Sequence, residues 1–152
     1  MAEPFILRRR AEFSDTDMAG IVHFAQFFKY MEAAEHAMFR AVGLSIVTEI
    51  AGEHVGWPRV HAECDYRSPL RFEEEFDIHA HVQQRRTRSL VLKFHFTRAA
   101  GDETIATGSL TTVCVAQDAQ RKMRAVAIPS MVGEALAPYT AAVADRDTAD
   151  SP

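Results

Sequence analysis

The chain has 152 residues, of which 47% are hydrophobic and 25% are charged, and its formal net charge is −4. This length predicts one domain, over residues 1–140, that is large enough to bury a sizeable core. The charge gives no sign of a nucleic-acid or anionic-membrane partner, and no apolar run approaches the length of a membrane span, so membrane insertion is not expected.

The first predicted elements are a strand over residues 5–13, a loop over residues 14–22 and a long helix over residues 23–42. Within the helix, apolar side chains recur at the spacing of 3.6 residues per turn, and Gly43 is a natural stop. The apolar face consists of Phe24, Phe27, Phe28, Met31, Ala34 and Met38. The pattern therefore predicts an amphipathic helix that covers a core with one face.

After Gly56, Trp57 and Pro58, the apolar period changes from 3.6 to 2, which is typical of strands with one buried face. The strands are expected over residues 59–67, 77–83, 90–96 and 104–116, with a further strand within 122–129 and a short helix over 130–139. One long helix with four or five long antiparallel strands predicts an α+β fold in which the sheet wraps around the helix. Residues 141–152 have almost nothing to bury and are predicted to be disordered.

The other face of this sheet would carry polar side chains, because a single helix covers only one face. They are His61, Glu63, His79, His81, Lys93 and His95. That face would be either wet or paired with a second copy of the chain. Assembly into a homo-oligomer is the natural way to complete the core.

A short motif precedes the helix and reads D-T-D-M-A-G-I-V-H-F from Asp15 to Phe24. Acidic residues in such places are commonly turn or cap residues, which is the structural interpretation of Asp15 and Asp17. A functional interpretation is also open. Gly20 permits positive φ or a close backbone approach, and the free N–H groups at the start of the helix face the loop. A carboxylate beside such donors can attack a polarised carbonyl or activate water to do so.

The pattern D-x-D-x-x-G-I-V before a helix resembles the active-site loop of the 4-hydroxybenzoyl-CoA thioesterase family, which has a hotdog fold. R-R-T-R-S at residues 85–89 and R-A-V-A-I-P at residues 124–129 are similar to later segments of that family. The resemblance extends over about residues 5–136. It implies an acyl-CoA thioesterase that releases a free carboxylic acid and coenzyme A, needs no cofactor, and assembles as a dimer of dimers with its site at a dimer interface.

The resemblance also implies roles for single residues. Asp17 would be the catalytic carboxylate, acting either as nucleophile or as general base, and the backbone N–H of Phe24 would polarise the thioester carbonyl. The family's nucleotide-binding arginines fall on Arg86, Arg88 and Arg124. Arginine binds phosphate oxygens bidentately, which suits coenzyme A, although a solvated turn is the alternative.

Three further residues have two interpretations each. A helical wheel places Glu35 on the apolar face, where a carboxylate is costly unless it is paired or faces a site, although a rim position is the alternative. Other hotdog thioesterases use a helix glutamate in catalysis, so Glu35 competes with Asp17. Glu32 lies at the edge of the apolar stripe. His23 is either a contact to the thioester or the attacking water, or a packed histidine.

The chain offers little support for other chemistry. Cys64 and Cys114 belong to no C-x-x-C pair and residues 1–10 lack the apolar core of a signal peptide, so free thiols in a reducing cytoplasm are expected. The histidines have no metal-ligand spacing, and Ser14 and Ser45 have no G-x-S-x-G context. The first alternative is a hotdog protein that binds acyl-CoA or acts as a scaffold without turnover. A hotdog hydratase or dehydratase would need a catalytic histidine, for which only His23 is suitably placed.

Overall fold

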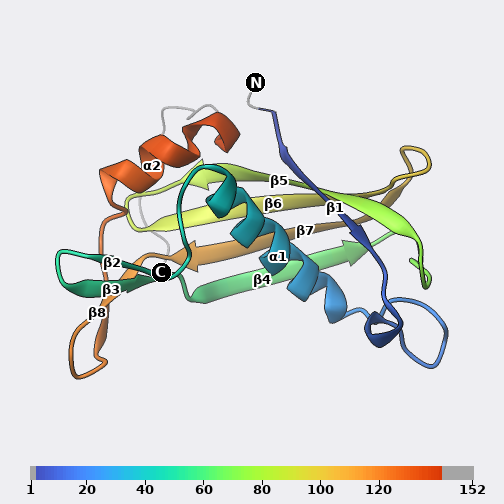
Figure 1. Ribbon diagram of the computed structural model, residues 1–152, viewed down its shortest axis with the longest axis horizontal. Helices are drawn as coiled ribbons and strands as arrows, with labels where there is room; N and C mark the ends of the chain where they lie inside the picture. The colour runs from blue at the N-terminus through green and yellow to red at the C-terminus, as the bar shows by residue number, and fades with distance from the viewer. Residues whose placement is uncertain (1–2, 142–152) are drawn as a thin grey trace.

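The computed structural model describes residues 3–141 (Figure 1). The elements, in chain order, are β1 (Phe5–Arg10), the 3-10 helix η1 (Phe13–Asp15), α1 (Gln26–Ala41), β2 (Thr48–Ile50), β3 (Glu53–Gly56), β4 (Arg59–Tyr66), β5 (Glu75–Arg85), β6 (Ser89–Arg98), β7 (Thr104–Val113), β8 (Val115–Gln117), β9 (Met123–Ala125), α2 (Ser130–Leu136) and the 3-10 helix η2 (Ala137–Tyr139).

A five-stranded antiparallel sheet, ordered β1-β5-β6-β7-β4, forms the body of the molecule, and α1 lies across one of its faces (Figure 1). Met31 and Met38 of α1 are fully buried. At Gly108 of β7 the helix approaches so closely that a Cβ would lie 2.4 Å from the Met31 sulfur. Only glycine permits this contact between helix and sheet. The α+β hotdog architecture expected from the sequence is confirmed.

A second, smaller sheet, ordered β2-β3-β8-β9, packs at one end of the molecule. Its strands have three or four residues each, too few for a period of two to be recognised in the sequence. β9 lies inside the segment predicted as a late strand, and α2 followed by η2 occupies the segment predicted as a short helix.

The N-terminal elements differ from the expectation in their bounds. The strand predicted over residues 5–13 ends at Arg10, and the chain forms the 3-10 helix η1 from Phe13. The helix predicted from residue 23 begins at Gln26, so Phe24 lies before it and is 61% exposed instead of buried on its apolar face. The predicted stop is confirmed, since Gly43 has a φ of +80°.

β4 is an edge strand and remains largely uncovered. Its alternating apolar residues were expected to face the core, yet Val60 is 63% exposed and Tyr66 is 45% exposed. The physical reason is its place at the border of the sheet, where no further strand covers its outer edge. An open edge with apolar side chains is a surface on which another strand pairs readily.

Two remaining expectations concern the C-terminal segment and membrane insertion. The predicted disordered segment, residues 141–152, lies outside the described residues except for Ala141. Between residues 3 and 141, no helix combines the length and apolar character needed to cross a membrane.

Candidate active site

The two acids of the loop motif have different environments. Asp15 is 8% exposed, and its Oδ2 accepts hydrogen bonds from the Glu12 N–H at 2.9 Å and the Tyr30 hydroxyl at 2.7 Å. Burial raises the pKa of Tyr30, and the bond to the Asp15 carboxylate raises it further, so the phenol stays protonated as a donor. Asp15 therefore anchors the loop to α1, and its burial keeps its carboxylate from substrate.

Asp17 remains accessible. Its Oδ1 accepts the Ala19 N–H at 2.8 Å, and its main chain pairs with Ile21 and Gly20 across a tight turn in which Gly20 has a φ of +77°. A Cβ at Gly20 would meet nothing nearby, so glycine is favoured there by conformation and not by space. The half-buried carboxylate lines a cleft of about 540 Å³ with Phe13, Thr16, Met18, Gly20 and Phe72.

The start of α1 presents a free backbone donor beside this loop. Within residues 3–141 no acceptor is paired with the Phe24 N–H, whereas the Gln26 N–H donates to the His23 carbonyl at 2.9 Å. The Ala25 N–H donates to Nδ1 of His23 at 3.2 Å, which leaves the proton of the neutral ring on Nε2. His23 is exposed and its ring lies against that of Phe24, so it caps the helix and is not a packed core histidine.

The helix acids form a pair with a residue that the sequence analysis missed. Glu35 is fully buried, and Nη1 of Arg59 donates to both of its carboxylate oxygens, at 2.8 and 3.0 Å. Burial raises the pKa of Glu35 to about 7, against the lowering effect of Arg59. Glu32 is largely exposed and lies 3.7 Å from Nη2 of Arg59.

These positions decide between the alternatives for Glu35. A rim position is wrong, because the side chain is inaccessible in the protomer. Nine residues of helix separate Glu35 from Gln26, which is roughly 14 Å along the axis, so it does not approach the Asp17 loop of its own chain. Arg59 is 24 positions from Glu35, and no local spacing in the sequence indicates this pair.

The three candidate nucleotide-binding arginines lie at the end of the sheet near α2. Arg86 and Arg88 are exposed on the β5–β6 turn, and the Thr87 carbonyl between them accepts the Ile128 N–H at 2.8 Å. The structure thus places the basic turn against the chain that follows β9, as the two matching segments suggest. Arg124 on β9 donates to both carboxylate oxygens of Glu53, at 2.5 and 2.7 Å, and these bonds lower the pKa of Glu53.

The acidic loop and the basic turn are not brought together within one protomer. The loop between β1 and α1 lies at one end of the sheet, and the β5–β6 turn lies at the other end beside α2 (Figure 1). The 16-residue helix α1 lies between them and has a length of about 24 Å. Within one protomer, the two groups of residues therefore do not form a single compact site.

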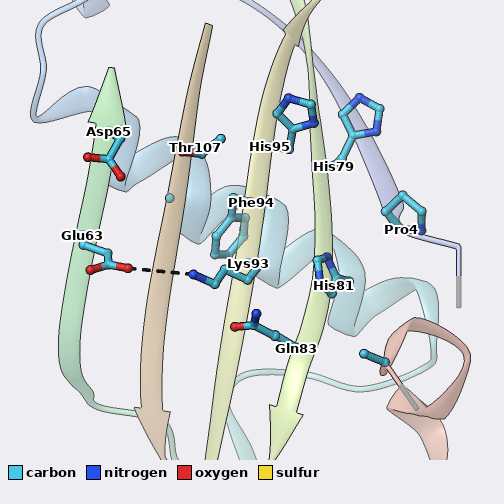
Figure 2. Close-up of a pocket in the computed structure, with 12 residues that line it drawn as sticks. Pro4, Glu63, Asp65, His79, His81, Gln83, Lys93, Phe94, His95 and Thr107 are labelled. Atoms are coloured by element: carbon cyan, nitrogen blue, oxygen red, sulfur yellow. Dashed lines mark ion pairs between the residues drawn. The ribbon is translucent and has the colours of Figure 1, made fainter. Parts of the chain in front are cut away.

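A second cavity, of about 770 Å³, lies on the sheet face that α1 leaves open. Figure 2 shows this groove with α1 behind the sheet. The polar residues predicted for that face line it: Glu63, His79, His81, Lys93 and His95. Lys93 lies 3.8 Å from Glu63, and burial lowers the pKa of His81 and His95. We take the smaller cleft as the candidate site, because the accessible Asp17 carboxylate lines it and the same loop leads to the unbonded Phe24 N–H before α1.

Neither cavity shows a metal centre. Among the residues that the structure describes, no group of three or more His, Cys, Asp or Glu side chains is placed to hold a metal ion. Cys64 and Cys114 are both free thiols, as expected from the sequence.

Comparison with known proteins identifies the family. A putative esterase of Aquifex aeolicus is 35% identical over 83 residues, which cover 53% of this chain and 62% of that protein, less than two thirds of its length. The crystal structure of a 1,4-dihydroxy-2-naphthoyl-CoA thioesterase from Synechocystis has a TM-score of 0.78 at 23% identity, covering 88% of this chain and 95% of the other. A mutant 4-hydroxybenzoyl-CoA thioesterase, crystallised with 4-hydroxybenzoyl-CoA, has a TM-score of 0.78 at 22% identity, with coverages of 89% and 99%.

At these identities the two crystal structures show a shared fold. Membership is established by the family profile, which matches residues 11–136 and so includes the acidic loop, α1, all strands of the main sheet except β1, and α2. The family suggested by the loop motif is confirmed, and the chain belongs to the thioesterase-like superfamily.

Proposed function

We propose that this chain is an acyl-CoA thioesterase and that Asp17 is its catalytic carboxylate. The observation that carries the proposal is an accessible carboxylate, Asp17, that lines a cleft and is followed by the unbonded Phe24 N–H just before α1. The N-terminus of a helix favours negative charge, so a thioester carbonyl that accepts the Phe24 N–H would be polarised there. The names of the relatives, which include thioesterases for aromatic acyl-CoAs, support the same reaction class.

The reaction adds water across the thioester. In the general-base route, Asp17 takes a proton from water, the water oxygen bonds to the carbonyl carbon, and the C–S bond breaks. Coenzyme A leaves as a thiolate and receives a proton. In the nucleophilic route, the Asp17 oxygen bonds to the carbonyl carbon, coenzyme A leaves, and water then hydrolyses the mixed anhydride. Both routes use the carboxylate oxygen that the Ala19 N–H does not hold.

The open edge of β4 suggests how the substrate meets both groups of residues. Antiparallel pairing of β4 with the β4 of a second copy, across a two-fold axis, would cover the exposed Val60 and continue the sheet. The two-fold axis rotates the main sheet of the partner subunit by 180°, so that its two ends exchange places. It would set the Asp17 loop of one subunit at the same end as the basic turn of its partner.

In this dimer, Arg86 and Arg88 of one chain would bind the phosphates of coenzyme A whose thioester lies at Asp17 of the other. Arg124 would join them after exchanging its bond to Glu53 for a phosphate. The sheet face opposite α1, which carries the groove lined by Glu63 and Lys93, is the surface through which two dimers would form the predicted homotetramer. We retain the cytoplasm as the predicted location.

The test is thiol release from a panel of benzoyl-CoA, hexanoyl-CoA and palmitoyl-CoA. The wild-type protein is expected to hydrolyse at least one of them, whereas binding without thiol release would identify an acyl-CoA-binding protein. Asp17→Asn is expected to lower kcat by about 10²–10⁴, the usual cost of losing a general base. Asp102→Asn, in the exposed β6–β7 turn, is the matched control and should leave turnover unchanged. If Glu35→Gln costs more than Asp17→Asn, the roles of the two carboxylates are exchanged.

A further inference from the structure

The phenol of Tyr66 joins the open edge strand to the start of α1. Tyr66 is the last residue of β4, and its hydroxyl donates to the Phe24 carbonyl at 2.8 Å across 42 residues of sequence. We infer that Tyr66 is a positioning residue that holds Phe24 so that its N–H points into the site. The inference rests on the proposed function, in which that N–H polarises the thioester carbonyl.

The two peptide groups that flank Phe24 are held by different bonds. The peptide that contains the Phe24 N–H is held through the His23 carbonyl, which accepts the Gln26 N–H at 2.9 Å. The following peptide is held through the Phe24 carbonyl, for which the Phe27 N–H is a distant donor at 3.4 Å. The Tyr66 hydroxyl is therefore the strong partner of that carbonyl. Without it, the Phe24–Ala25 peptide keeps only the distant bond from the Phe27 N–H and the 3.2 Å bond from the Ala25 N–H to Nδ1 of His23.

Tyr66 is itself well fixed. Its ring meets Phe27 edge to face with centroids 5.2 Å apart, and the Arg67 and Ser68 N–H groups that follow it both donate to the Ile105 carbonyl. Burial, and then the neighbouring Cys64, raise the pKa of Tyr66 to about 12, so the hydroxyl remains a donor at any pH at which the enzyme would be assayed. β4 thus holds Tyr66 firmly in place, and Tyr66 in turn supports the turn that carries the Phe24 N–H.

The test variant is Tyr66→Phe, which keeps the ring and removes the hydroxyl. Loss of an oxyanion donor costs about 10²–10³ in kcat, and loss of its alignment should cost less, about tenfold. KM should stay within about twofold, because the nucleotide end of the substrate is untouched. Tyr139→Phe is the matched control. Tyr139 lies in η2, its ring packs against Phe5, and its hydroxyl makes no hydrogen bond among the described residues.

A second measurement does not depend on turnover. ¹⁵N relaxation should show the Phe24 N–H as rigid in the wild type and in Tyr139→Phe, and as more mobile in Tyr66→Phe, with the thermal stability of all three alike. A Tyr66→Phe variant with wild-type kcat, or with an equally rigid Phe24 N–H, would overturn the inference. Absence of thiol release by the wild type would instead refute the proposed function, and the relaxation comparison would still decide the role of Tyr66 in ordering this turn.

Discussion

Arg59→Met gives a direct test of the buried charge pair on α1. The substitution keeps an unbranched side chain of similar length and removes both hydrogen bonds to Glu35, whose side chain is fully buried. An unpaired carboxylate would then remain between α1 and β4. Removing one partner of a buried pair destabilises proteins by about 3–5 kcal/mol. For a domain of this length that corresponds to a fall in Tm of roughly 6–20 °C.

The effect should depend on pH. Burial raises the pKa of Glu35 from 4.5 to about 7, so the stability that this group contributes is full below pH 4.5 and is lost as pH rises through 7. Arg59 opposes that loss by favouring the ionised form. At pH 8 the variant must either bury the carboxylate without a partner or protonate it, and both cost free energy, whereas at pH 5 the carboxyl is protonated with or without Arg59. We expect the destabilisation to be clearly larger at pH 8 than at pH 5.

The assay is urea unfolding at both pH values and at one fixed protein concentration, since association also contributes to stability. The double variant Glu35→Gln with Arg59→Met should recover most of the loss at pH 8. Arg8→Met removes an exposed ion pair to Asp77 and should change stability little at either pH. A loss below about 1 kcal/mol for Arg59→Met, or an equal loss at both pH values, would refute the role assigned to the pair.

Two further predictions concern the proposed two-chain site. Alanine at Arg86, Arg88 or Arg124 should raise KM for acyl-CoA more than it lowers kcat. Hydrolysis of a benzoyl pantetheine thioester, which lacks the nucleotide, should be unaffected. Equal losses on both substrates would mean that the arginines support the fold. Dilution should lower specific activity as dimers separate, and Val60→Lys, at an exposed position of the edge strand β4, should have the same effect at higher concentration. Sedimentation of a stable, fully active monomer would contradict the shared site.

The long elements could be predicted because the spacing of their apolar residues reflects which face of each element is buried. The 3.6-residue spacing of Phe27, Met31, Ala34 and Met38 records one buried helix face, and the alternation along β5 and β6 records one buried sheet face. Gly43 ends the helix as its conformational freedom suggests. The short strands β2 and β3 escaped detection because three or four residues carry too little pattern, and β8 was joined to β7 in the strand predicted over residues 104–116.

The candidate site was predicted only in part. The local motif identifies an acidic loop before a helix, yet it does not distinguish Asp15 from Asp17. That difference comes from Tyr30, which buries and binds the first acid and leaves the second exposed to the cleft. Likewise, the periodicity places Phe24 on the apolar face, whereas the fold starts the helix two residues later and leaves the Phe24 N–H free.

By itself, then, the sequence determined the class of fold, the long helix, the principal strands and the segment in which an acid meets a helix start, because each depends on neighbours along the chain. Tertiary structure alone decided which partners meet. The Glu35–Arg59 pair and the bond from Tyr66 to Phe24 join residues 24 and 42 positions apart. Such contacts depend on strand order, register and the side of the sheet that the helix covers, which local spacing does not encode.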